Sequence, residues 1–124
     1  MSLSDLTPTA FIHTTDAKRS TAFYVEVLGL ELVAESPFAV VVRAGVTTIR
    51  ITPVESHDPA AATVLGWVVD DVDATLAELV GKGVEALRFD GMEQSETGVW
   101  NAPDGARIAW FHDPDRNTLS LAQV

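Results

Sequence analysis

The chain has 124 residues, 47% of them hydrophobic, and a formal charge of −10 from 18 acidic and 8 basic side chains. This length and composition suit a single folded domain, which we expect to span 1–124. An acidic surface repels phosphate backbones and anionic lipids, so nucleic-acid and membrane partners are not expected. The absence of cysteine excludes disulfides and thiolate chemistry.

The first ten residues, MSLSDLTPTA, have neither the basic region nor the apolar run of a signal peptide. No apolar stretch approaches the roughly 18 residues that a bilayer-spanning helix needs. We therefore expect a cytoplasmic protein.

Two copies of one strand–helix–strands module make up the sequence. Asp16 and Asp70 each follow an apolar strand and begin a helical pattern, and they lie 54 residues apart (70 − 16). Gly29 and Gly83 end the two helices with the same separation (83 − 29). Because the repeat coincides with helix starts and stops, it indicates a duplicated supersecondary unit.

Module one covers about 8–53 and begins with a strand at 8–15. Asp16 is the expected N-cap of its helix, because a carboxylate can accept the free amides of a first helical turn. The apolar stripe of this helix consists of Phe23, Val27 and Leu28. Three more strands follow, the last two joined by a tight turn at Ala44-Gly45, and are expected at 30–35, 38–43 and 46–53.

Module two covers about 64–123, after a connection at 53–63 that contains two prolines. Its first strand is expected at 64–69, and either Asp70 or Asp71 caps the helix. The apolar stripe of this helix consists of Val72, Leu76, Leu79 and Val80. With a hairpin turn at Asp104-Gly105, the remaining strands are expected at 84–88, 97–102, 106–112 and 117–123.

Side chains alternate across a strand, so each strand has one face for its helix and one for something else. Aliphatic residues such as Ile12, Ile49 and Leu119 suit the helix side. The opposite face mixes hydroxyls, aromatics, a histidine and an arginine, and it lacks the Lys and Glu typical of a solvated face. This mixture favours a ligand-binding surface. The candidate ligand-binding residues are Thr9, Phe11, His13, Thr48, Arg50, Thr52, Trp110 and Ser120.

Three segments resemble the glyoxalase I / bleomycin-resistance / extradiol-dioxygenase superfamily, which has the vicinal-oxygen-chelate fold. They are TTDAKRSTAFYVEVLGLEL (14–32), GWVVDDVDATLAELVGKGVE (66–85) and PDGARIAWFHDPDRNTLSL (103–121). Arg116 stands where the family usually has glycine. The resemblance implies an α+β fold of two βαβββ modules that form an open, cup-shaped mixed sheet with helices outside. It also implies a homodimer.

The metal-dependent members of this superfamily place His, Gln or Glu ligands at four inward positions, which fall here on Thr9, Arg50, Val64 and Ser120. Valine has no donor atom, arginine is a cation, and neutral hydroxyls alone bind divalent cations poorly. We therefore expect neither a metal nor another cofactor. Metal-dependent glyoxalase I or dioxygenase chemistry is not expected either, because both need an electrophilic metal.

Two polar residues of the inner face are open to two interpretations each. His13 could be a general base or a hydrogen-bond donor to a ligand, or it could be held by packing alone. Arg50 could bind a carboxylate or enolate through charge-assisted hydrogen bonds, or it could pair internally with Glu93 or Glu96. His57 is expected to be solvated in the connection.

Trp110 is the candidate aromatic residue of module two. Aligning the turn at Gly105 with that at Gly45 (105 − 45 = 60) matches Trp110 to Arg50. The alignment puts Trp110 and His112 on the inner face and Phe111 on the helix side. Trp110 could stack on a planar ligand or serve in the core. The stretch 113–117, DPDRN, is typical of a turn.

Three functions remain open, each with a small organic molecule as the partner. The first is metal-free binding of that molecule in the cup. The second is a metal-independent isomerase or lyase in which His13 moves a proton and Arg50 stabilises an oxyanion. The third is sequestration of a cationic antibiotic by an acidic dimer, as in the bleomycin-resistance proteins.

Overall fold

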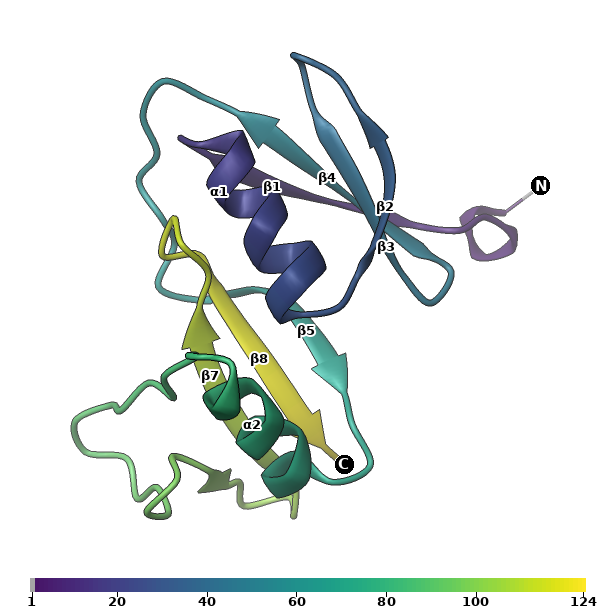
Figure 1. Ribbon diagram of the computed structural model, residues 1–124. Coiled ribbons are helices and arrows are strands. Elements are labelled where there is room, and N and C mark those ends of the chain that lie inside the picture. Colours follow the sequence, from purple (N-terminus) through teal and green to yellow (C-terminus); the bar gives the residue numbers. More distant parts are fainter. Residues whose placement is uncertain (1) are drawn as a thin grey trace. The chain divides into compact units, whose positions relative to one another are not determined.

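A computed structural model describes residues 2–124 of the chain. The chain divides into two compact units, Met1–Asp58 and Pro59–Val124 (Figure 1). Both contain a four-stranded mixed sheet with a helix packed on one face. The predicted α+β class with two βαβββ modules is thereby confirmed. None of the described helices is long and apolar enough to span a membrane.

The first unit has the strand order β1-β4-β3-β2. The first and last of these strands in the chain, β1 and β4, pair in parallel, and the other neighbours pair antiparallel. All three strands expected after the helix are present, with ends shifted by one or two residues. The elements in chain order are η1 (Leu3–Asp5), β1 (Thr9–Thr14), α1 (Ala17–Ala22), η2 (Phe23–Val27), β2 (Glu31–Glu35), β3 (Val40–Ala44) and β4 (Thr47–Pro53).

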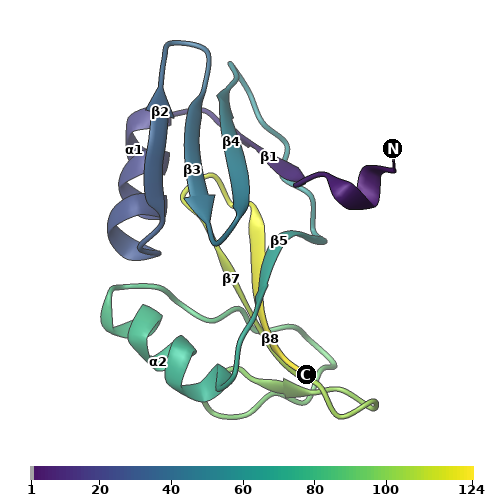
Figure 2. The ribbon, with the colours of Figure 1, turned by 90° about the vertical axis from the view of Figure 1, so that its right-hand side faces the viewer.

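The helix of the first unit begins where the sequence predicts. The carboxylate of Asp16 accepts a hydrogen bond from the Arg19 amide at 3.1 Å, which satisfies a free donor of the first turn. After α1 the chain continues into one π-helical turn, η2, and Figure 2 shows this helix alongside the sheet. Within η2 the fully buried side chain is Tyr24, whereas the predicted Phe23, Val27 and Leu28 are only half-buried.

The second unit has the strand order β5-β8-β7-β6, again with its first and last strands paired in parallel. Asp71 is the helix cap, since its carboxylate accepts the Ala74 amide at 3.1 Å. Val72, Leu76 and Leu79 are buried as predicted, while Val80 is 50% exposed. The elements are β5 (Thr63–Val68), α2 (Val72–Gly81), β6 (Trp100–Asn101), β7 (Arg107–His112) and β8 (Thr118–Gln123).

The predicted strand at 84–88 is wrong, and the one at 97–102 shrinks to the two residues of β6. Gln94 explains the difference. Its side-chain amide donates to the carbonyls of Leu87 and Gly98, both at 2.8 Å, and its carbonyl oxygen accepts the Phe89 amide at 2.8 Å. One side chain thus occupies backbone groups that a strand ladder would otherwise use.

The strand orders of the two sheets correct the alignment of the repeat. By position in the sheet, β8 matches β4 and β7 matches β3, so the turn at Gly105 does not correspond to that at Gly45. Ser120 is the counterpart of Arg50, because Ser120 pairs with Gly66 as Arg50 pairs with Phe11. Trp110 instead lies beside Ser120.

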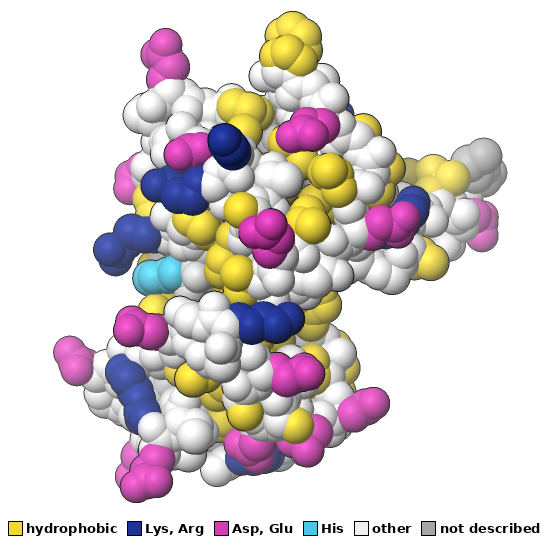
Figure 3. All heavy atoms as spheres, in the orientation of Figure 1, with side chains coloured by type: hydrophobic (Ala, Val, Ile, Leu, Met, Phe, Trp, Pro, Cys, Tyr) yellow, Lys and Arg dark blue, Asp and Glu magenta, His cyan; other side chains and the backbone are white. Residues whose placement is uncertain are grey.

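Acidic side chains are dispersed over the face of the molecule seen in Figure 3 and form no single patch there. Residues 59–124 nevertheless hold 11 of the 18 acidic side chains and 4 of the 8 basic ones. The second unit therefore carries most of the negative charge of the chain.

Candidate functional site

Six of the eight predicted ligand-binding residues lie together on one face of the first sheet. The parallel register of β1 and β4 sets them side by side in three pairs: Thr9 with Thr48, Phe11 with Arg50, and His13 with Thr52. This is the face opposite the buried Ile12, Ile49 and Ile51. The alternation of side chains thus places these residues as predicted, and their ligand-binding role stays a prediction.

The hydroxyls at one end of this face are engaged within the sheet. Thr48 Oγ1 donates to Thr9 Oγ1 at 2.9 Å, and Thr9 Oγ1 donates to the Thr48 carbonyl at 3.0 Å. Such paired hydroxyls stabilise neighbouring strands.

His13 has an aromatic neighbour that the sequence does not predict. Its ring lies 5.7 Å from that of His57, centroid to centroid, with the ring planes at 82°. His57 lies in the irregular connection as expected, but it is only partly exposed there. No sequence pattern marks this contact, because a histidine in an irregular connection has no periodicity that could be matched to a strand.

Arg50 and Phe11 form the most exposed pair of this face, and Phe11 is 63% exposed. Within the described part of the first unit, residues 2–58, the Arg50 guanidinium has no hydrogen bond or ion pair. Arg43 differs, since its guanidinium lies 2.9 Å from the Glu31 carboxylate. Glu93 and Glu96, the alternative partners of Arg50, belong to the second unit.

The other two predicted residues, Trp110 and Ser120, are direct neighbours across β7 and β8 of the second sheet. Trp110 belongs to an aromatic cluster on the face opposite the buried Phe111. Its ring centroid lies 6.1 Å from that of Trp100 and 5.4 Å from that of Phe89, the latter contact edge-to-face at 87°. Spacing such as this is typical of favourable aromatic pairs.

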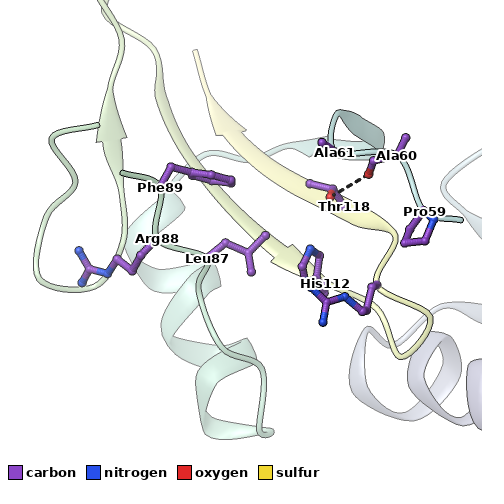
Figure 4. Close-up of a pocket in the computed structure, with 9 residues that line it drawn as sticks. Pro59, Ala60, Ala61, Leu87, Arg88, Phe89, His112 and Thr118 are labelled. Atoms are coloured by element: carbon purple, nitrogen blue, oxygen red, sulfur yellow. Dashed lines mark hydrogen bonds between the residues drawn. The ribbon is translucent and has the colours of Figure 1, made fainter. Parts of the chain in front are cut away.

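A pocket of about 360 Å³ adjoins this cluster within the second unit (Figure 4). Phe89 belongs to both, because it lines the pocket and contacts Trp110. Figure 4 shows Leu87 and Phe89 on one side of the cavity, with Pro59 and Ala60 on the other. The complete lining consists of Pro59, Ala60, Ala61, Leu87, Arg88, Phe89, His112, Arg116 and Thr118.

His112 is the titratable group of this pocket wall. Partial burial lowers its pKa below the ordinary value, and the nearby positive charge of Arg116 lowers it further. The Asp113 carboxylate opposes both effects. The net direction favours the neutral imidazole, which can both donate and accept a hydrogen bond.

The four positions at which metal-dependent relatives hold their ion do not fit a metal here. Thr9 and Ser120 offer neutral hydroxyls, Arg50 is a cation, and Val64 has no donor atom. Within residues 2–124, no group of three or more His, Cys, Asp or Glu side chains could hold a metal ion.

Several residues of the second unit take part in this surface without having been predicted from the sequence. The sequence pattern predicts a strand at Leu87, no element at Phe89 and only a turn at Arg116. Trp100 lies on the same face as Trp110, because its partner Ile108 alternates with the buried Ala109. A two-residue strand carries too short an alternation to reveal that face in advance.

The family description Glyoxalase/Bleomycin resistance protein/Dioxygenase superfamily matches residues 7–121 of the chain. A comparison with curated proteins found no match. Among solved structures, the antibiotic binding protein TnmS3 from Streptomyces sp. CB03234 is 27% identical, with a TM-score of 0.68 over 94% of this chain and 93% of that one.

Two other solved structures are similar in fold alone. A superfamily member from Sphaerobacter thermophilus DSM 20745 is 23% identical, with a TM-score of 0.72 over 95% of this chain and 96% of that one. Lactoylglutathione lyase from Agrobacterium tumefaciens is 18% identical, with a TM-score of 0.72 over 93% and 90% of the two chains.

Proposed function

This chain belongs to the Glyoxalase/Bleomycin resistance protein/Dioxygenase superfamily, and we propose that it binds a small organic molecule without a metal ion. The molecule has a planar, apolar body and lies on the open face of the second sheet. One observation carries this proposal: the aromatic cluster around Trp110 continues through Phe89 into the pocket.

The chemistry of this surface suits such a ligand. Small-molecule sites are concave, mostly apolar and about 300–1,000 Å³ in volume, with a few polar groups that fix orientation. The pocket here falls within that range, and Leu87, Phe89 and Pro59 supply its apolar walls. Aromatic side chains add about 0.5–1.5 kcal/mol per well-placed ring contact beyond the area they bury.

Two further observations favour binding without metal-assisted turnover. The donor atoms at the four family metal positions are unsuited to a divalent cation. In addition, the antibiotic binding protein TnmS3 is 27% identical to this chain over nearly its full length. We accordingly propose a role in holding or sequestering the molecule, and a cytoplasmic homodimer as the working form.

A second candidate function is a metal-independent isomerase or lyase on the open face of the first sheet. The observation that favours it is the register of β1 and β4, which places His13 and Arg50 on the same face of adjacent strands. His13 would then move a proton next to a carbonyl and Arg50 would stabilise the oxyanion. Turnover that His13→Ala abolishes while ligand binding persists would support this enzyme, and normal turnover by that variant would contradict it.

The binding proposal is tested with 2-naphthamide, a neutral planar probe, by isothermal titration calorimetry. We expect Trp110→Ala to weaken its binding by about tenfold or more, the equivalent of 1.4 kcal/mol, because the ring contacts are lost. Phe11→Ala is the matched control, since it removes an exposed ring from the open face of the first sheet. Full affinity in Trp110→Ala, or an equal loss in Phe11→Ala, would show that the cluster is not the binding surface.

A further inference from the structure

We infer that the pocket of the second unit binds the carboxylate group of an aromatic acid, with the guanidinium of Arg116 as its main anchor and His112 beside it. The inference rests on the proposed function and names the class of ligand. The aromatic body of the acid then lies along Phe89 toward Trp110.

The charge of the pocket wall is opposite to that of its unit. Residues 59–124 hold 11 acidic and 4 basic side chains. The lining nevertheless includes Arg88, Arg116 and His112 and no Asp or Glu. A cavity wall that carries the positive charge of Arg116 and no carboxylate is suited to an anion, and a cationic drug would be repelled there.

The two arginines of the lining differ in what their guanidinium groups do. Arg88 donates to the Ser95 carbonyl at 2.6 Å and also to the Glu96 carbonyl, so it holds the 88–96 loop. Figure 4 shows the Arg88 side chain directed away from His112 and Thr118. The Arg116 side chain has no hydrogen bond or ion pair within the described second unit, and its fork of donors is available to a carboxylate.

The backbone of Arg116 supports the same assignment. Its φ is 66°, and no other non-glycine residue in the described chain has a positive φ. An L-residue in this conformation costs about 1–2 kcal/mol, which glycine would avoid. Strain of this kind often persists where the side chain serves a site, and Arg116 is one of the residues that line the pocket.

The neighbouring groups complete a recognition pattern for an aromatic acid. His112 and Thr118 add polar atoms to the lining, to which Arg116 also belongs. Leu87 and Phe89 form an apolar side (Figure 4). An Arg–carboxylate pair forms two parallel hydrogen bonds, which fix both position and orientation. A ring attached to that carboxylate can then continue onto the Phe89 and Trp110 contact.

The test compares 2-naphthoate with its neutral isostere 2-naphthamide at low salt, by calorimetry and by amide chemical-shift mapping. We expect the wild-type protein to bind the acid about tenfold or more tightly than the amide, since charge-assisted hydrogen bonds are roughly twice as strong as neutral ones. The acid should shift the amides of His112, Arg116 and Thr118.

Two variants distinguish a specific contact between Arg116 and the carboxylate from an effect of the unit's net charge. Arg116→Gly removes the guanidinium and suits the left-handed backbone, so it should fold and should lose the preference for the acid. Lys82→Gln removes the same charge from the second unit but lies outside the pocket lining, and it should keep the preference.

Equal affinities for the acid and the amide in the wild-type protein would overturn the carboxylate site and leave the proposed planar-ligand surface standing. An unchanged preference in Arg116→Gly, or shifts confined to residues outside the pocket, would overturn it as well. Loss of amide binding in Trp110→Ala tests the proposed function separately.

Discussion

The two sheets of this chain share a strand order but carry different chemistry on their open faces. The first presents threonines, His13 and Arg50 from β1 and β4. The second presents an aromatic cluster and a pocket with basic groups. Their buried faces are alike, with Ile49 and Ile51 in one and Leu119 and Leu121 in the other. Aliphatic packing therefore maintains the repeated fold, while the open faces are free to differ.

The matched positions of Arg50 and Ser120 illustrate the difference between the two open faces. The residue paired with Arg50 is the exposed Phe11, whereas the residue paired with Ser120 is Gly66. A Cβ at position 66 would lie 2.5 Å from Ser120 Oγ, so the second sheet has no room there for a side chain without a shift of Ser120. The same place in the repeat thus carries a ring in one unit and bare backbone in the other.

The largest expected effect concerns the β7–β8 turn, which has the place in the second sheet that the β3–β4 turn has in the first. The β7–β8 turn is organised by the buried Asp113 carboxylate, which accepts the Asp115 and Asn117 amides at 2.9 Å and the Asn117 side chain at 2.8 Å. Asp113→Ala leaves these donors without their acceptor, and we expect the free energy of unfolding to fall by about 3 kcal/mol. Urea denaturation measures it.

Asp104→Ala is the control for this turn, since the exposed Asp104 accepts only the Ala106 amide in the β6–β7 turn. Its expected cost is below about 1 kcal/mol. If both variants lose the same free energy of unfolding, the hydrogen bonds of Asp113 stabilise the β7–β8 turn no more than the bond of Asp104 stabilises the β6–β7 turn.

A smaller effect is expected from the helices. At its centre α2 buries Leu76, whereas α1 buries Ser20, whose hydroxyl has no hydrogen-bond partner in the described structure. Ser20→Ala removes a buried polar group and raises helix propensity, so the free energy of unfolding should rise by about 0.5–1 kcal/mol. Thermal and urea unfolding of the variant measure the change.

The buried hydroxyl of Thr14 provides the contrast to Ser20. It donates to the Asp16 carbonyl at 3.0 Å and accepts the Asp16 amide at 3.1 Å. Thr14→Val should therefore destabilise the protein. A loss of stability in Ser20→Ala as well would reveal that the Ser20 hydroxyl is satisfied in solution.

The smallest expected effect is a pH dependence specific to the second unit. Because the folded-state pKa of His112 is lowered, the unfolded chain binds the proton more readily. The contribution of His112 to stability is therefore fully present above its ordinary pKa of 6.5 and is lost as the pH falls below that value. His112→Gln should flatten this part of the stability profile.

An NMR titration of the His112 ring checks the cause of that shift. Arg116→Gly removes a positive charge that lowers the pKa of His112, so the pKa should rise in the variant. A pKa that stays the same would assign the shift to burial alone.

The sequence pattern predicts those structural features that depend on residues adjacent in the chain. Alternation identified the faces of β1, β4 and β7, and Asp16 capped its helix as expected, because both depend on adjacent residues. The segment 84–98 escaped prediction because the side chain of Gln94 replaces a strand ladder. The contact of His57 with His13 and the pocket lining depend on tertiary packing, which a single sequence does not report.

The parallel pairing of β5 with β8 has a consequence for how the chain folds during synthesis. Thr63 pairs with Thr118, which is synthesised 55 residues later (118 − 63), whereas Thr9 pairs with Thr48 after 39 residues. At about 5–20 residues per second, the ribosome needs roughly 3–11 s to make those 55 residues. Throughout that time β5 lacks its sheet neighbour, and its valines and free backbone groups are open to other nascent chains or to a chaperone. The first sheet can close while the second is still being translated.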